Sequence, residues 1–132
     1  MIQHVKAHEV EGVRAPAPHA RTLKHLVAPW TTGSSQLWVG LSEVDAGSSS
    51  NPHAHDNEEV FFVVAGYGRI HVEGQTVDVG PGSCVLVPGG AVHRLLNDGH
   101  EVLRVLCSVA PPFERAVFDD RHLLDNEQGE ST

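Results

Sequence analysis

The sequence predicts an all-β protein, a sandwich, barrel or jelly roll with about seven to nine short strands. The first observation is a regular series of short apolar segments between residues 35 and 110, separated by turn residues. The second is that no ten-residue segment carries a convincing helical period. The third is the length of 132 residues, which corresponds to one domain.

Residues 35–44 and 58–65 are the first two strands expected in the core. Apart from its two leading glutamates, segment 58–65 consists of β-branched, aromatic and small apolar residues, which is typical of a well-buried strand. Residues 69–73 alternate polar and apolar side chains and therefore predict a half-exposed strand. Gly74 indicates a hairpin that leads into the next strand at 76–79.

Three more strands are expected before residue 110. Residues 83–87 are apolar and stop at a Pro-Gly-Gly turn at 88–90. The next strand covers 91–96, and the Asn-Asp-Gly sequence after it predicts a tight turn because these residues tolerate positive φ. Residues 101–109 form the last expected strand.

The chain therefore divides into three parts. Residues 1–34 are expected to form a polar, loosely attached N-terminal arm, with an edge strand near its end. Residues 35–110 form the β core. Residues 111–132 form a charged C-terminal tail, with one short helix or strand near 113–119.

The charge of the chain excludes two classes of partner. Nine Lys and Arg residues against 17 Asp and Glu residues give a net charge of -8. A general nucleic-acid binder needs a basic face, and so does a protein that binds anionic membranes, so neither partner is expected. No apolar run is long enough to span a bilayer, and the first residues lack a signal-peptide pattern. We expect a cytoplasmic protein.

The ten histidines are the unusual feature of the composition, and three of them join one carboxylate in a metal-ligand pattern. His53 and His55 share a face if that stretch is extended. Glu59 begins the most apolar strand, where an ionised carboxylate is costly unless it is paired or metal-bound. His93 begins a later apolar strand after a turn. Together they predict a site for one divalent transition metal, namely Fe, Mn, Ni, Zn, Co or Cu.

Two other carboxylates near these histidines are alternatives for the ligand role. Asp56 and Glu58 lie between His55 and Glu59. Glu58 lies on the opposite face of the strand from Glu59, so Glu59 is preferred. The set contains no thiolate, which argues against a structural zinc site.

At these residues the sequence resembles the cupin superfamily, specifically the small single-domain cupin-2 type. The first motif of that family is matched in full by Gly47, His53, His55, Glu59 and Gly66. The second motif is matched in full by Gly82, Pro88, Gly90, His93 and Asn97. The resemblance implies a jelly-roll β-barrel with the metal near one open end and a homodimer of such barrels.

The resemblance does not name the reaction, because cupins include enzymes of many classes and ligand-sensing modules. We expect a metalloenzyme that binds a small organic molecule with oxygen donor groups, first a dioxygenase and second an isomerase or lyase. Glu59 is then a ligand that can also accept a proton. The alternative is a non-catalytic module that binds or senses a small ligand.

Strand parity offers further candidates for the substrate pocket. Phe61 shares the face of Glu59, and Trp38 shares with Gln36 a face that is one of two that could point inward. Arg104 interrupts an apolar strand, where it either faces solvent on the outer side or faces inward and could bind a substrate carboxylate. The histidines expected to be solvent-exposed are His4, His8, His19, His25, His100 and His122.

Overall fold

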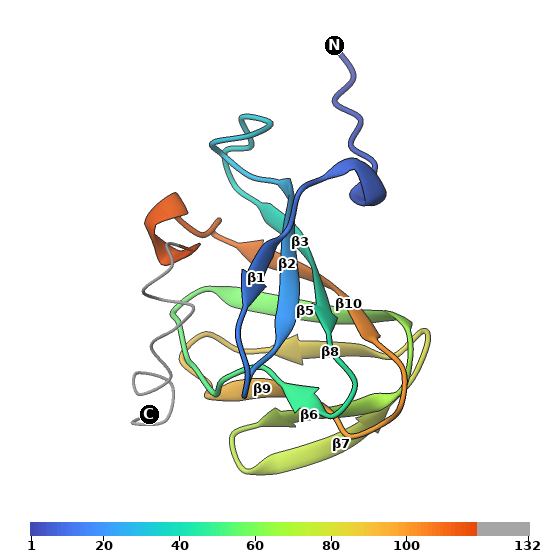
Figure 1. Ribbon diagram of the computed structural model, residues 1–132. Coiled ribbons are helices and arrows are strands. Elements are labelled where there is room, and N and C mark those ends of the chain that lie inside the picture. The colour runs from blue at the N-terminus through green and yellow to red at the C-terminus, as the bar shows by residue number, and fades with distance from the viewer. Residues whose placement is uncertain (119–132) are drawn as a thin grey trace.

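The computed structural model describes residues 1–118, and these residues form two antiparallel sheets that face each other. The six-stranded sheet has the order β1-β2-β3-β10-β5-β8, and the four-stranded sheet has the order β4-β9-β6-β7 (Figure 1). The strands are β1 Val13–Ala15, β2 Arg21–Val27, β3 Trp38–Val44, β4 Ser48–Ser49, β5 Glu58–Ala65, β6 Gly68–Val72, β7 Gln75–Val79, β8 Cys84–Val87, β9 His93–Asn97 and β10 Leu103–Ala110. Two short 3₁₀ turns, η1 Ala7–Glu9 and η2 Arg115–Phe118, are the helical elements of the described residues. The predicted all-β jelly-roll barrel is confirmed.

Alternating burial along the central strands builds the interior of the barrel. In β10 every second side chain from Leu103 to Val109 is buried, and in β5 Phe61 and Val63 are buried while Phe62 is exposed. Strand side chains point to opposite faces in turn, so one face of each sheet supplies the core. The same alternation directs Glu59 of β5 and His93 of β9 inward.

The N-terminal arm contributes more to the barrel than the sequence predicts. Strand β2 pairs with β3 from Arg21 opposite Val44 to Val27 opposite Val39, and β1 adds one further strand outside it. The expected edge strand is therefore followed by a full strand of the main sheet. The sequence of β2 gives no signal of a core strand, because its side chains after Arg21 are only half-buried and several of them are polar.

Two of the arm histidines expected in solvent are not solvent-exposed. His19 is buried, and His25 packs its ring against Trp30 and Trp38. The reason is that β2 and the residues before it lie along the barrel, so that His25 accepts a hydrogen bond from Nε1 of Trp38 and His19 lies beside the backbone carbonyl of Ser49.

Asn97 holds together the loops at one end of the barrel. It is fully buried, and its Nδ2 donates to the carbonyls of Val44, Asp45 and Glu101, while its Oδ1 accepts from the backbone N–H of Gly99. The predicted turn at 97–99 is therefore fixed from both sides by one side chain.

The C-terminal segment after β10 turns back across the barrel end at 111–118 and ends in η2. The short element expected near 113–119 is thus a 3₁₀ turn. The rest of the expected tail, including His122, lies outside the described residues. Among the helices that the structure describes, none is long and apolar enough to cross a membrane.

Candidate metal centre

The fold brings His53, His55, Glu59 and His93 into one cluster. His53 and His55 lie in the loop between β4 and β5, whereas Glu59 lies in β5 and His93 is the first residue of β9. A β-bridge joins the two distant histidines, since the His53 N–H donates to the carbonyl of His93 at 3.1 Å and the His93 N–H donates back at 2.9 Å. The four candidate ligand atoms lie within 4.8 Å of one another.

Backbone carbonyls orient all three imidazoles in the same way. Each ring places its Nδ1 next to a backbone carbonyl oxygen close to it in the chain. The pairs are His53 with Asn51 at 2.9 Å, His55 with Asn57 at 3.1 Å and His93 with Ala91 at 2.8 Å. A carbonyl only accepts, so Nδ1 carries the proton and the lone pair of each neutral ring is on Nε2. Hydrogen bonds of this kind fix histidine ligands in metal sites.

The Nε2 atoms of His55 and His93 lie close to the carboxylate of Glu59, which is 5% exposed. Its Oε1 lies 3.0 Å from Nε2 of His55 and 3.4 Å from Nε2 of His93. Two acceptors this close need a cation between them, either a proton or a metal ion. Nε2 of His93 is buried and has no hydrogen-bond partner in the described part of the chain.

These distances suit a metal ion. Ligand bonds of about 2.0–2.2 Å place donor atoms about 3 to 4 Å apart around one ion. The donor set is three imidazole nitrogens and one carboxylate oxygen, which suits divalent transition metals. The cluster of His53, His55, Glu59 and His93 could therefore hold a metal ion.

The pKa shifts in the cluster favour the protonation states that a metal ion needs in its ligands, a neutral imidazole and an ionised carboxylate. Burial, followed by the nearby His93, lowers the pKa of His53 from 6.5 to about 4. Burial raises the pKa of Glu59, but the adjacent imidazoles of His55 and His93 outweigh it, so this pKa lies below its ordinary 4.5. At neutral pH the imidazole of His53 is therefore neutral and the carboxyl group of Glu59 is ionised.

Cys107 lies next to Glu59 of the cluster, although the sequence did not predict it as a site residue. The residue is buried in β10, and burial together with the charge of Glu59 raises the pKa of its thiol well above 9.0. It therefore stays a neutral thiol beside the carboxylate. Strand parity could have found it, because Cys107 shares the inward face of Val105 and Val109.

The two sequence motifs that supply the ligands of this cluster fall within one known domain. The Cupin_2 family, described as a cupin domain, matches residues 40–109. The chain belongs to the cupin family. The predicted resemblance is confirmed, and the cupin's barrel and ligand cluster lie mainly within the matched region.

This cupin resembles other proteins in sequence and solved structures in fold. It is 40% identical to an uncharacterized protein of Streptomyces coelicolor over 74 residues, which cover 56% of this chain and 70% of that protein. A predicted oxalate decarboxylase from Thermotoga maritima has a TM-score of 0.75 and 20% identity, covering 83% of this cupin and 99% of that chain. The polyketide cyclase RemF from Streptomyces resistomycificus has a TM-score of 0.73 and 24% identity, covering 93% and 91%. At these identities the solved structures show the fold alone.

The other residues predicted for the cupin's pocket lie in different places. Phe61 borders the cluster, with its ring 5.8 Å from that of His93. Trp38 is buried and packs on Phe113, which in turn packs on His55. Gln36 is exposed ahead of β3.

Arg104 does not reach the cluster, which corrects its assignment to the pocket. Its Nε donates to Glu43 of the neighbouring β3 at 3.0 Å, and its side chain is 39% exposed. The alternation of β10 explains this, because Leu103 and Val105 take the inward positions on either side. Asp56 and Glu58, the alternative carboxylates, are both exposed.

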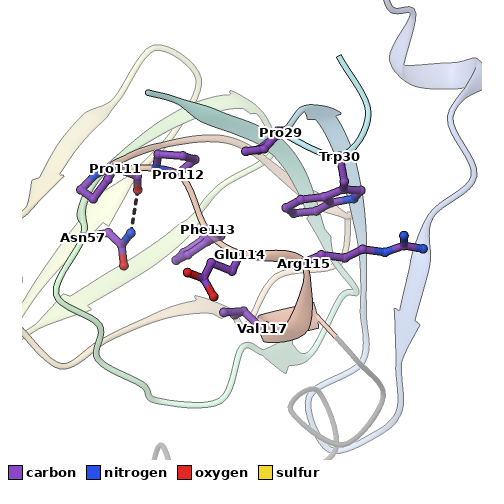
Figure 2. Close-up of a pocket in the computed structure, with 9 residues that line it drawn as sticks. All are labelled: Pro29, Trp30, Asn57, Pro111, Pro112, Phe113, Glu114, Arg115 and Val117. Carbon is purple, nitrogen blue, oxygen red and sulfur yellow. Dashed lines mark hydrogen bonds between the residues drawn. The ribbon is translucent and has the colours of Figure 1, made fainter. Parts of the chain in front are cut away.

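An open cavity of about 830 Å³ adjoins the metal centre, and Figure 2 shows the residues around it. Pro29 and Trp30 come from the loop after β2, Asn57 from the loop before β5, and the rest from the C-terminal segment. Phe113 stands between the cavity and the ligands, with its ring perpendicular to that of His55 at 4.9 Å between ring centres. The sequence pattern does not reveal this cavity, because most of its walls come from the expected arm and tail.

Proposed function

We propose that this cupin binds one divalent transition metal through His53, His55, Glu59 and His93 and acts as a metalloenzyme on a small organic molecule. One observation carries the proposal. Three imidazoles are held by backbone carbonyls at Nδ1, the Nε2 atoms of His55 and His93 lie at 3.0 Å and 3.4 Å from one buried carboxylate, and a ligand atom of His53 lies within 4.8 Å of the others. The metal is one of Fe, Mn, Ni, Zn, Co or Cu, because these ions accept imidazole and carboxylate together.

The substrate is expected to carry oxygen donors, such as a carboxylate, an enediol or a hydroxy-keto group. Four protein ligands leave about two positions in an octahedral shell, which a bidentate substrate can fill. The metal would supply Lewis-acid chemistry and, if redox-active, access to dioxygen. Glu59 is the carboxylate in the cluster, and we assign it the role of proton acceptor as well as ligand.

A dioxygenase is the first choice of reaction class, followed by an isomerase or a lyase. The two structural neighbours are named for unlike reactions, so the fold gives no reason to prefer either. The alternative is a barrel that binds a small ligand without converting it. The homodimer and the cytoplasmic location stay predictions.

Elemental analysis tests the proposal. The untagged protein is purified without chelator, and the metal-to-chain ratio is measured by mass spectrometry before and after titration with Fe(II), Mn(II) and Zn(II). We expect about one metal per chain, and we expect oxygen consumption in a substrate screen if the native metal is redox-active. If no metal is found and none is taken up on titration, the metalloenzyme proposal fails.

Two alanine variants make the assignment specific. His55→Ala removes a ligand and should abolish stoichiometric metal binding while the apolar core keeps the barrel folded. His71→Ala is the matched control, because His71 lies on the outer side of β6 and contacts Thr76 at 2.9 Å. If His55→Ala and His71→Ala lose metal equally, the ligand assignment is wrong. If the His55→Ala protein is unfolded, the metal stabilises the fold and is not primarily catalytic.

A further inference from the structure

The open cavity beside the metal centre has walls suited to a flat apolar ligand. Trp30 and Phe113 contribute aromatic rings, Val117 contributes an aliphatic side chain, and three prolines complete the rim. A volume of about 830 Å³ lies within the range of small-molecule sites in proteins. Aromatic ligands gain stability against such rings through offset or edge-to-face contacts.

Two polar groups at this cavity, the amide oxygen of Asn57 and the carboxylate of Glu114, are hydrogen-bond acceptors, whereas Arg115 and the indole N–H of Trp30 are donors. Asn57 uses its Nδ2 to donate to the carbonyl of Pro111 at 2.6 Å, which leaves its Oδ1 as the free end of the amide. Glu114 is exposed and has no ion-pair partner among residues 1–118. Figure 2 shows its carboxylate on the side of Asn57, whereas the guanidinium of Arg115 extends away from that side.

The cavity also lies one side chain away from the metal ligands. The ring of Phe113 forms its floor and meets the ring of His55 edge to face. Asn57 borders both regions, since its backbone carbonyl faces Nδ1 of His55 while its side chain holds Pro111. The ring of Phe113 is therefore all that separates a ligand in this cavity from the imidazole of His55.

We propose that this cavity binds the aromatic part of the substrate, a flat ring system that carries hydroxyl groups. Trp30 and Phe113 contact its faces, and Glu114 and Oδ1 of Asn57 accept hydrogen bonds from its hydroxyl groups. The proposal rests on the proposed function in one respect, that the bound ring system belongs to the substrate of the metal centre. It assigns Trp30 and Glu114 as residues that determine specificity.

Calorimetric titration of chelator-treated protein tests the cavity apart from the metal. The probes are 2-naphthol, 2-naphthoate and cyclohexanol. We expect 2-naphthol to bind about tenfold more tightly than 2-naphthoate, because the carboxylate of Glu114 repels a second carboxylate. Cyclohexanol should bind weakly, because it has a hydroxyl group without a flat ring.

Two variants with matched controls place the probe in the cavity. Glu114→Ala should weaken 2-naphthol binding by about fivefold through loss of a charge-assisted hydrogen bond, while Glu101→Ala at an exposed site elsewhere should not. Trp30→Ala should weaken it by about tenfold, with the exposed Tyr67→Ala as its control. Circular dichroism checks that each variant is folded, and Glu114→Ala tests the site even if Trp30→Ala unfolds.

The outcomes separate this inference from the proposed function. No binding of 2-naphthol, either to chelator-treated protein or to protein reloaded with one equivalent of Zn(II), overturns the inference while the metal site stands. Binding that Glu114→Ala and Trp30→Ala leave unchanged also overturns it. Binding of 2-naphthol by a protein that takes up no metal supports the cavity and contradicts the metalloenzyme.

Discussion

The backbone carbonyl of Asn57 faces Nδ1 of His55 at 3.1 Å, so a residue that is not a ligand fixes the orientation of one that could be. The side chain of the same asparagine donates to the carbonyl of Pro111 at 2.6 Å. Asn57 thus connects the ligand loop to the C-terminal segment. The two hydrogen bonds use different parts of the residue, so a substitution can remove one and keep the other.

Asn57→Ala should loosen the C-terminal segment without removing the metal. The lost hydrogen bond is exposed, so we expect the free energy of unfolding to fall by about 0.5–1 kcal/mol. Trypsin should cleave after Arg115 faster than in the parent, which mass spectrometry of timed digests would follow. Asp56→Ala, at the exposed neighbouring position, is the control. Loss of metal from Asn57→Ala would contradict this division of roles, because the backbone carbonyl remains.

The metal-free protein should lose stability as the pH falls from about 6.5 to about 4. His53 has a folded pKa of about 4 against 6.5 in the unfolded chain. Between these values the unfolded state binds the extra proton, so acid favours unfolding. Urea denaturation of chelator-treated protein across this range measures the effect. The decrease should be smaller in His53→Gln, and an equal decrease in both proteins would count against the buried neutral imidazole.

Neighbouring phenylalanines in β5 should respond very differently to truncation. Phe61 is 3% exposed and contacts the ring of His93, whereas Phe62 is 41% exposed on the outer face. Phe61→Ala should cost about 3–5 kcal/mol of unfolding free energy because it leaves a cavity in the core. Phe62→Ala should cost less than about 1 kcal/mol. Denaturant titrations without metal compare them, and similar costs would mean that the inward register of β5 is wrong.

The strands were predictable wherever the signal was local. The segment 58–65 predicted from its β-branched and aromatic residues coincides with β5 Glu58–Ala65, and the Asn-Asp-Gly turn follows β9 as expected. Alternation also predicted that Phe61 and Glu59 share an inward face. These features depend on neighbours along the chain, which a sequence displays directly.

Residues whose contacts are distant in the sequence were harder to place. His25 looks like a solvent histidine in a polar arm, yet it lies against Trp30, Trp38 and Phe118. The apolar neighbours of Arg104 left both an inward and an outward side chain open, and only the pairing of β10 with β3 shows that its partner is Glu43. Neither contact leaves a local pattern, because each depends on which strands pair.

The sequence by itself determined most strands between residues 35 and 110, the barrel and the four residues that could hold a metal, because alternation and motif spacing are local features of the chain. Only the tertiary structure decided that backbone carbonyls orient the three imidazoles toward Glu59. It alone also placed Phe113 on His55 and opened the cavity toward Trp30. The physical reason is that these arrangements arise from the path of the arm and the C-terminal segment over the barrel end, which long-range packing fixes.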